Sequence, residues 1–214
     1  PVAGAELARL GALVVPDRPA AGLNAALRYG AERVRERRPH APVAALNGDL
    51  PALRAAELAG VLRAGAGPRE RAFLADAAGV GTTLLSAGPG AALSPAFGGP
   101  SRARHLASGA RETTLADVPS VRQDVDTLDD LRAALARRIG DTLGLARRAG
   151  QAVSGFAKAR EWLASGRAAL VVQASDGSAD ERARFLGGNA GAIPAVAPLD
   201  GATLGAIFGR DHAV

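Results

Sequence analysis

Hydrophobic residues in the first part of the chain alternate between helical spacing and short apolar runs. Helical spacing covers 3–10, 22–38 and 54–64, whereas 12–15 and 43–46 are short apolar runs typical of buried strands. The order helix, strand, helix, strand, helix predicts an α/β fold with a mostly parallel sheet covered by helices. Ligands of such sheets bind at the carboxyl ends of the strands.

The pattern changes after residue 70. Two short strands at 71–76 and 81–87 flank a glycine-containing turn, which predicts an inserted antiparallel element, and residues 88–100 are a loop rich in glycine and proline. The remaining predicted elements are a helix at 101–108, an extended segment at 120–127, helices at 128–138, 141–149, 154–165, 178–186 and 201–208, strands at 168–173 and 195–197, and a Gly/Asn-rich loop at 187–192.

A short junction at Arg138–Gly140 separates two predicted parts of the chain, residues 1–138 and 139–214. The length of 214 residues allows one α/β domain or two small ones. No internal repeat relates the two parts, and no long linker joins them.

Composition excludes several classes of protein. With 48% hydrophobic residues the chain can build a buried core, and with no cysteine it has no disulfide, no thiolate zinc site and no thiol nucleophile. Its apolar runs are far shorter than the ~18 residues of a membrane span, and residues 1–30 carry no signal-peptide pattern, so we expect a cytoplasmic protein that does not bind membranes. The net charge of +5 comes almost entirely from arginines and is explained by the codon usage of a GC-rich genome before any nucleic acid is invoked.

Three carboxylates are the strongest candidate for chemistry. Asp49 follows the strand at 43–46, and Asp124 and Asp126 lie two positions apart in an extended segment, where alternate side chains share a face. Magnesium prefers oxygen ligands and commonly bridges one or two carboxylates to nucleotide phosphates. The alternative is a solvent-exposed strand end or a helix cap. A P-loop is excluded because no G-x-x-x-x-G-K-[ST] motif occurs.

Two glycine-containing segments are candidate anion sites. In GVGTT (79–83), glycines allow a ligand to approach the backbone, and the hydroxyl of Thr82 can hold a phosphate oxygen; the alternative is a simple hairpin turn. In FGGPSRARH (97–105), small donors and a cation lie near a predicted helix start; the alternative is a flexible glycine loop with a capping serine. The residues concerned are Gly98, Ser101, Arg102 and His105.

Five segments resemble, in chain order, the CofC/FbiD family. They are GLNAALRYGA (22–31), VAALNGDLPALRAAELA (43–59), GVGTTLL (79–85), FGGPSRARHLASGA (97–110) and RQDVDTLDDL (122–131). Members of that family are guanylyltransferases of deazaflavin-coenzyme biosynthesis with a nucleotidyltransferase fold similar to that of MobA. They join GTP to 2-phospho-L-lactate or phosphoenolpyruvate and release pyrophosphate.

This resemblance implies a set of site residues. Asp49, Asp124 and Asp126 would be the ligands of Mg²⁺, and Thr82, Gly98 and Ser101 would hold the phosphorylated acceptor. It also implies a mixed sheet in residues 1–138, which begin within the family pattern without its first βα unit.

Residues 140–214 resemble a different family, the YlxQ/YlxR-type RNA-binding domain, in TLGLARRAGQAVSGFAKAREWLASGRAALVVQASDGSADERARFL (142–186) and GRDHAV (209–214). This resemblance implies a small α/β/α sandwich that contacts RNA phosphates. The candidate cations are Arg147, Arg148, Lys158 and Arg160, whose alternative role is an ordinary solvated helix face. The two resemblances suggest a chimera of two families, and the sequence leaves three hypotheses: guanylyltransferase, RNA-binding module, and folded chain without either function.

Overall fold

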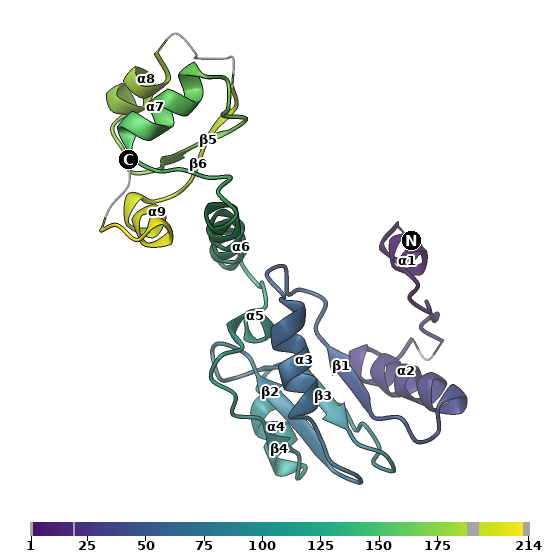
Figure 1. Cartoon of the computed structure of the whole chain (residues 1–214). Coiled ribbons are helices and arrows are strands. Elements are labelled where there is room, and N and C mark those ends of the chain that lie inside the picture. Colours follow the sequence, from purple (N-terminus) through teal and green to yellow (C-terminus); the bar gives the residue numbers. More distant parts are fainter. Residues whose placement is uncertain (1, 19, 188–192, 212–214) are drawn as a thin grey trace. The chain divides into compact units, whose positions relative to one another are not determined.

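Figure 1 shows a computed structural model of the chain, which describes residues 2–18, 20–187 and 193–211. The chain divides into two compact units, Pro1–Asp126 and Thr127–Val214. The first unit contains α1 (Val2–Arg9), α2 (Leu23–Arg37), β1 (Val43–Leu46), α3 (Ala55–Arg63), β2 (Arg71–Ala75), β3 (Thr82–Ala87), α4 (Ser101–Ala107), β4 (Arg111–Glu112) and α5 (Pro119–Arg122). The second contains α6 (Leu128–Arg148), α7 (Phe156–Ala164), β5 (Val171–Ala174), α8 (Ala179–Leu186), β6 (Ala195–Leu199) and α9 (Gly201–Phe208).

The sheet of the first unit is mixed and has the order β1-β3-β2-β4. β3 pairs antiparallel with both β1 and β2, and β2 pairs parallel with β4. The α/β class and the mixed sheet are therefore confirmed. The mostly parallel sheet expected from the helix–strand alternation is wrong, because the β2–β3 hairpin inserts β3 between the two strands that run in the same direction.

Two apolar clusters cover opposite faces of this sheet. Neighbouring residues of a strand point to opposite faces, and in β2 Phe73 belongs to one cluster and Leu74 to the other. Leu27 of α2 packs against the Phe73 cluster, whereas Val61 of α3 is part of the Leu74 cluster. Burial thus explains Val61 of α3, whereas α2 contributes the partly buried Leu27 and leaves Leu23 and Val34 exposed.

Two predicted elements of the first unit are absent. The segment 12–15 is not a strand: Leu13 is 56% exposed, and no strand in the described ranges pairs with it, so its backbone has no ladder to join. The predicted extended segment 120–127 instead begins within α5, which has a proline at its first position, and continues as a loop from Gln123.

The second unit is built on one long helix. α6 starts with a capping box between Thr127 and Asp130 and runs without interruption to Arg148, so the predicted helix break at Arg138–Gly140 is wrong. Ile139 packs against the small core of this unit, which includes Leu199 and Leu204, and the position of a Cβ on Gly140 would lie 3.4 Å from the Ile207 side chain. Residues 138–140 therefore lie within one helix and pack against its neighbours, and the chain divides into its two compact units after Asp126.

The remaining elements of this unit fit the prediction. β5 and β6 pair in parallel, and α9 begins with Asp200 as its N-cap. The predicted loop 187–192 lies, apart from Gly187, outside the described residues. No helix in the described part of the chain combines the length and the apolar character that a membrane span requires.

Candidate functional site

Acidic residues follow two strands at one edge of the first sheet. β1 and β2 run in the same direction on either side of β3, so their carboxyl ends lie at the same edge. Asp49 comes shortly after β1, and Asp76 comes directly after β2. This is the edge at which an α/β sheet presents ligand-binding side chains.

A third segment joins this edge from the loop after α5. The backbone N–H of Val125 donates to the carbonyl of Asp49 over 3.1 Å, which ties the two predicted metal-binding segments together. Burial raises the pKa of the Asp124 carboxyl, and the negative charges of Asp126, Asp76 and Asp49 raise it further. The predicted carboxylates Asp49, Asp124 and Asp126 therefore share one electrostatic environment.

The donor chemistry of this edge fits a hard divalent cation. The described residues contain no group of three acidic, histidine or cysteine side chains already arranged as metal ligands. Magnesium needs fewer, because it is commonly held by one or two carboxylates with the substrate phosphates completing its shell. Asp124, whose ionised form is disfavoured by its carboxylate neighbours, is the residue that a cation would stabilise most directly.

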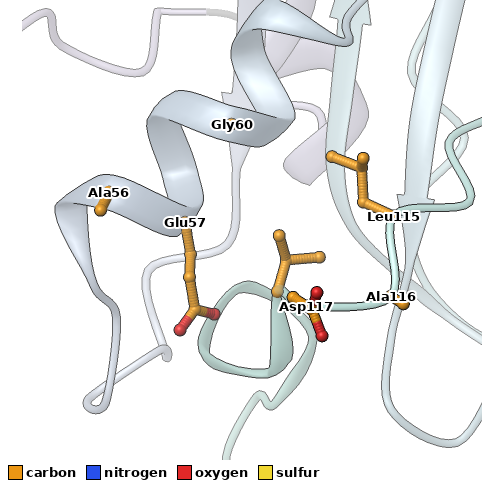
Figure 2. A pocket seen from close by; sticks show the side chains of 7 residues that line it. Ala56, Glu57, Gly60, Leu115, Ala116 and Asp117 are labelled. Carbon is orange, nitrogen blue, oxygen red and sulfur yellow. The ribbon is translucent and has the colours of Figure 1, made fainter.

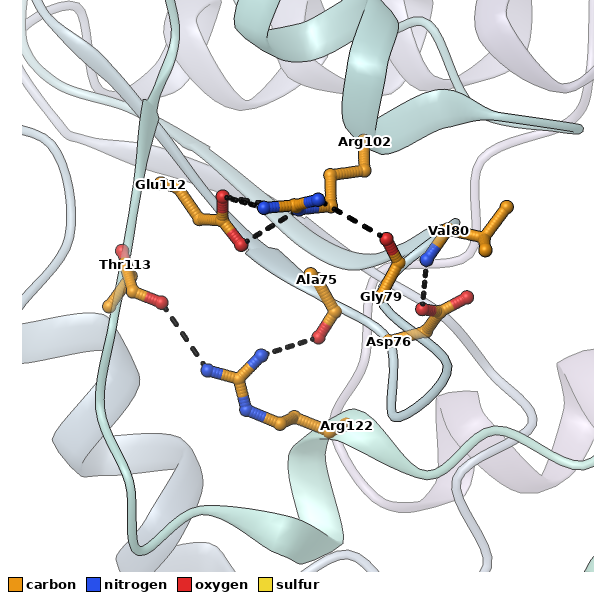
Figure 3. Close-up of polar contacts among 8 residues, drawn as sticks. All are labelled: Ala75, Asp76, Gly79, Val80, Arg102, Glu112, Thr113 and Arg122. Atoms are coloured by element: carbon orange, nitrogen blue, oxygen red, sulfur yellow. Dashed lines mark hydrogen bonds and ion pairs between the residues drawn. The ribbon is translucent and has the colours of Figure 1, made fainter.

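The sequence analysis did not single out Asp76. Its position directly after a buried strand could have identified it as a candidate ligand-binding carboxylate. Its two oxygens accept the N–H groups of Val80 over 2.9 Å and Gly81 over 2.7 Å, the first of which is drawn in Figure 3. A Cβ at position 81 would meet a carboxylate oxygen of Asp76, so a larger residue there would have to displace that carboxylate from the turn. Because these N–H groups are occupied, GVGTT is a hairpin turn whose backbone at 80 and 81 does not offer donors to phosphate.

Two arginines fix the segments around this turn (Figure 3). Arg122 donates to the carbonyls of Ala75 over 2.9 Å and Thr113 over 3.4 Å, which closes the end of β2 against the segment after β4. Arg102 forms a two-pronged ion pair with Glu112, whose hydrogen bond and charge raise the pKa of the arginine. Arg102, a candidate cation in the sequence, is thus neutralised by Glu112.

Thr82 lies at the start of β3 and contacts a buried histidine. Ala75 pairs with Thr82 and Leu74 with Leu84, so a bulge at Thr83 shifts the register. The Thr82 Oγ1 is 3.0 Å from the Nδ1 of His105, and the Nε2 of that ring accepts the N–H of Ala96 over 3.0 Å. His105 therefore connects β3 to the loop that carries Gly98.

The loop 97–101 is held at both ends. Asn24 of α2 accepts the N–H of Phe97 over 2.8 Å and donates to its carbonyl over 3.1 Å. Ser101 begins α4 and is buried one turn before His105, so the two side chains share a face of that short helix. Of the predicted acceptor residues, Thr82 contacts the imidazole directly, whereas Gly98 follows its other partner Ala96 by two positions and Ser101 precedes His105 by one helical turn.

The Arg104 guanidinium lies close to the two glycines of this loop. Gly98 and Gly99 both have positive φ, and the position of a Cβ on either would be 3.9 Å from the Arg104 guanidinium. Within the described ranges, that guanidinium has no hydrogen-bond or ion-pair partner, in contrast to the guanidinium of Arg102. Arg104 is a candidate anion contact that the sequence analysis did not single out.

A surface depression of about 380 Å³ lies on another part of the first unit, between α3 and residues 115–118 (Figure 2). Glu57, on its rim, already accepts the N–H of Ser120 and pairs with Arg54. The depression is lined by none of the predicted site residues, and we assign it no function.

The four predicted RNA contacts lie in the second unit. Arg147 donates to the carbonyl of Ile207 over 2.7 Å, and Arg160 donates to the carbonyl of Phe185 over 2.8 Å, so each binds a carbonyl near the end of a helix. These two arginines have a structural role that the sequence analysis did not foresee. RNA contact by Arg148 and Lys158 stays a prediction, and no feature of the described residues favours it.

Comparison with known proteins finds no family model that matches the chain. The chain is similar to the phosphoenolpyruvate guanylyltransferases of Streptomyces coelicolor, at 66% identity over 138 residues, and Streptomyces avermitilis, at 66% over 140 residues. It is also similar to that of Thermomonospora curvata, at 58% over 140 residues. These stretches cover 64 to 65% of this chain and 61 to 65% of the relatives, so the chain spans slightly less than two thirds of their length.

Proposed function

We propose that the chain acts as a guanylyltransferase on a phosphorylated three-carbon acid, with phosphoenolpyruvate as the acceptor. The acceptor phosphate oxygen attacks the α-phosphorus of GTP. One P–O bond forms while the bond from the α-phosphorus to the bridging oxygen breaks, and pyrophosphate leaves. The product is a guanylylated diphosphate, whose place in deazaflavin-coenzyme biosynthesis belongs to the same proposal.

The observation that carries the proposal is the high identity to proteins named phosphoenolpyruvate guanylyltransferase. The gathering of Asp49, Asp124 and Asp126 at one sheet edge supports it, since transfer between phosphates depends on positioning and on neutralising charge. The names of these relatives favour phosphoenolpyruvate over 2-phospho-L-lactate as acceptor.

The acidic edge would hold Mg²⁺ through Asp124 with Asp49 or Asp126. When bound, the ion neutralises phosphate charge and polarises the reacting phosphorus–oxygen bonds. The chain's own contribution is to keep these carboxylates together: the hydrogen bond from Val125 to Asp49 prevents the two segments from separating under their mutual repulsion.

The acceptor would lie against the loop of Gly98. Thr82 and Ser101 supply hydroxyl groups, and Gly98 allows close approach because it carries no side chain. Arg104 supplies the positive charge that a phosphate or carboxylate requires, because Arg102 is already paired with Glu112.

The experiment is a pyrophosphate-release assay on the full 214-residue chain with GTP and Mg²⁺, with phosphoenolpyruvate and 2-phospho-L-lactate as alternative acceptors. We expect release that requires both the metal and an acceptor and that is lost in Asp124→Asn, with higher kcat/KM for phosphoenolpyruvate. Release that is independent of the acceptor, or none from the folded chain, would contradict the proposed function. A preference for 2-phospho-L-lactate would contradict the choice of acceptor alone.

A further inference from the structure

His105 is fully buried, and the proposed chemistry gives it no role. It is 0% exposed, and its ring lies against Phe73 and Phe97, with centroid distances of 5.5 and 5.4 Å. Both ring nitrogens nevertheless have a partner, Thr82 at Nδ1 and the backbone of Ala96 at Nε2. A buried imidazole needs partners for its polar nitrogens, and here these partners lie on two different segments, the start of β3 and the loop before Gly98.

The contact with Ala96 determines where the imidazole proton lies. A backbone N–H can only donate, so Nε2 accepts, and the proton of the neutral ring is on Nδ1. Burial lowers the pKa of His105 to about 4, and the positive charges of Arg71 and Arg104 contribute to this shift. The ring is therefore neutral at pH 7 and donates its Nδ1–H to the Oγ1 of Thr82.

This direction of donation constrains the hydroxyl group of Thr82. Its oxygen accepts from His105, so the hydroxyl proton points away from the ring, and no acceptor for it lies among the described residues. Thr82 is only 4% exposed, which limits solvent competition for that proton. A buried hydroxyl prepared in this way is suited to donate to an anionic oxygen.

We propose that His105 is a positioning residue: it directs the hydroxyl proton of Thr82 toward an anionic oxygen of the acceptor, and through Ala96 it holds the Gly98 loop at the same place. This inference rests on the proposed function, in which Thr82 binds the acceptor. It adds the direction of the hydrogen bond between His105 and Thr82. It also makes the position of the Gly98 loop depend on the same imidazole ring.

Two substitutions separate the two contacts of the ring. In His105→Asn, the amide N–H can replace the Nδ1 donor to Thr82, while the acceptor for Ala96 is lost. In His105→Gln, the amide oxygen can replace the Nε2 acceptor, while the donor to Thr82 is lost. Both variants lose the aromatic packing against Phe73 and Phe97, so they are matched controls for stability.

The readout is the KM for phosphoenolpyruvate and for GTP, with kcat, in pyrophosphate release. We expect His105→Gln and Thr82→Val each to raise the KM for phosphoenolpyruvate about tenfold, because each removes the directed hydroxyl donor. His105→Asn keeps the donor to Thr82 and loses only the contact that holds the Gly98 loop, so it should raise this KM less, by about threefold at most, and the KM for GTP should not change. In the double variant, the two effects should not add, because His105 acts through Thr82.

Equal losses in His105→Asn and His105→Gln would overturn the positioning role and leave only packing. Additive effects of His105→Gln and Thr82→Val would overturn it as well.

Nitrogen NMR of the unliganded wild type gives an independent readout: a proton on Nε2 at pH 7 would contradict the hydrogen-bond direction whether or not the chain is active. A wild-type chain with the expected Nδ1 proton but no binding of phosphoenolpyruvate would instead show that the proposed function is wrong.

Discussion

The negative charge of Asp124 is unfavourable in the folded chain because the side chain is partly buried and lies near other carboxylates. Partial burial and the charges of Asp126, Asp76 and Asp49 raise its pKa, so the ionised form is disfavoured in the folded state relative to the unfolded chain. The side chain therefore reduces stability at neutral pH in the absence of a cation. A carboxylate that lowers stability in the absence of its ligand is typical of a residue retained for binding.

Asp124→Asn should make the metal-free chain more stable while removing the response to magnesium. We expect the melting temperature at pH 7 to rise by about 1–3 °C, because one repelling charge disappears. The stabilisation that Mg²⁺ with GTP gives the wild type should be lost. A thermal melt with and without ligand measures both effects, with Asp117→Asn as the control; a lower melting temperature for Asp124→Asn would contradict the repulsion argument.

Two arginines on α4, two positions apart, have different expected roles. Arg104→Gln should raise the KM for phosphoenolpyruvate about tenfold with little loss of stability, because its guanidinium lies over Gly98 and Gly99 without a protein partner in the described ranges. Arg102→Gln should lower the melting temperature by a few degrees, since it leaves Glu112 without its ion pair. Steady-state kinetics and thermal melts on both variants test this contrast; the reverse pattern would assign the anion contact to Arg102.

At the scale of elements, a glycine that indicates a helix end in the sequence can lie inside a continuous helix. Gly140 was interpreted from the sequence as the end of one helix and the start of another. In the structure it lies inside α6, next to Ile207 of α9. The position of a Cβ on this residue would lie at an ordinary contact distance from Ile207, so packing does not require glycine there, and the glycine weakens the helix by about 1 kcal/mol relative to alanine.

Substitutions at Gly140 distinguish the continuous helix from two helices with a break. Gly140→Ala should stabilise the second unit by at most about 1 kcal/mol, since the new methyl group would meet only the flexible end of Ile207 at an ordinary contact distance. Gly140→Leu should destabilise it, because the larger side chain would displace α9. Chemical denaturation followed by circular dichroism measures both; destabilisation by alanine would indicate a break at this position.

At the scale of the whole molecule, pH acts on stability through the buried ring of His105. Its pKa is about 4 in the folded chain and about 6.5 in the unfolded chain. Below pH 6.5 the unfolded chain binds a proton that the folded chain does not, so stability falls as pH falls from 6.5 to about 4. The loss from this group is at most about 3 kcal/mol.

Melting curves between pH 7 and pH 4.5 test this linkage. The wild type should lose stability over this range more steeply than His105→Asn, which has no ionisable ring at this position. Equal slopes for the two proteins would show that His105 titrates in the folded chain as it does in the unfolded chain. The carboxylates are common to both proteins, so the difference between the slopes isolates the histidine.

The sequence by itself determined the class of the fold and the position of most elements. Helical spacing and short apolar runs depend on local geometry, so α2, α3 and the strands β1 to β3 lie close to their predicted ranges. Asp49 was found because a carboxylate after a buried strand needs no tertiary information. The same rule applied to residues 71–75 would have found Asp76.

Tertiary structure alone decided which strands pair, which residues meet and which polar groups are already occupied. The pairing of β1 with β3 depends on contacts between segments far apart in the chain, whereas the antiparallel hairpin of β2 and β3 is local and was predicted from the sequence. Tertiary contacts also decide the partners of His105, the neutralisation of Arg102 by Glu112 and the binding of Ile207 by Arg147. The physical reason is that local patterns report which face is buried, whereas the charge and hydrogen-bond direction of a site are set by groups that only the fold brings together.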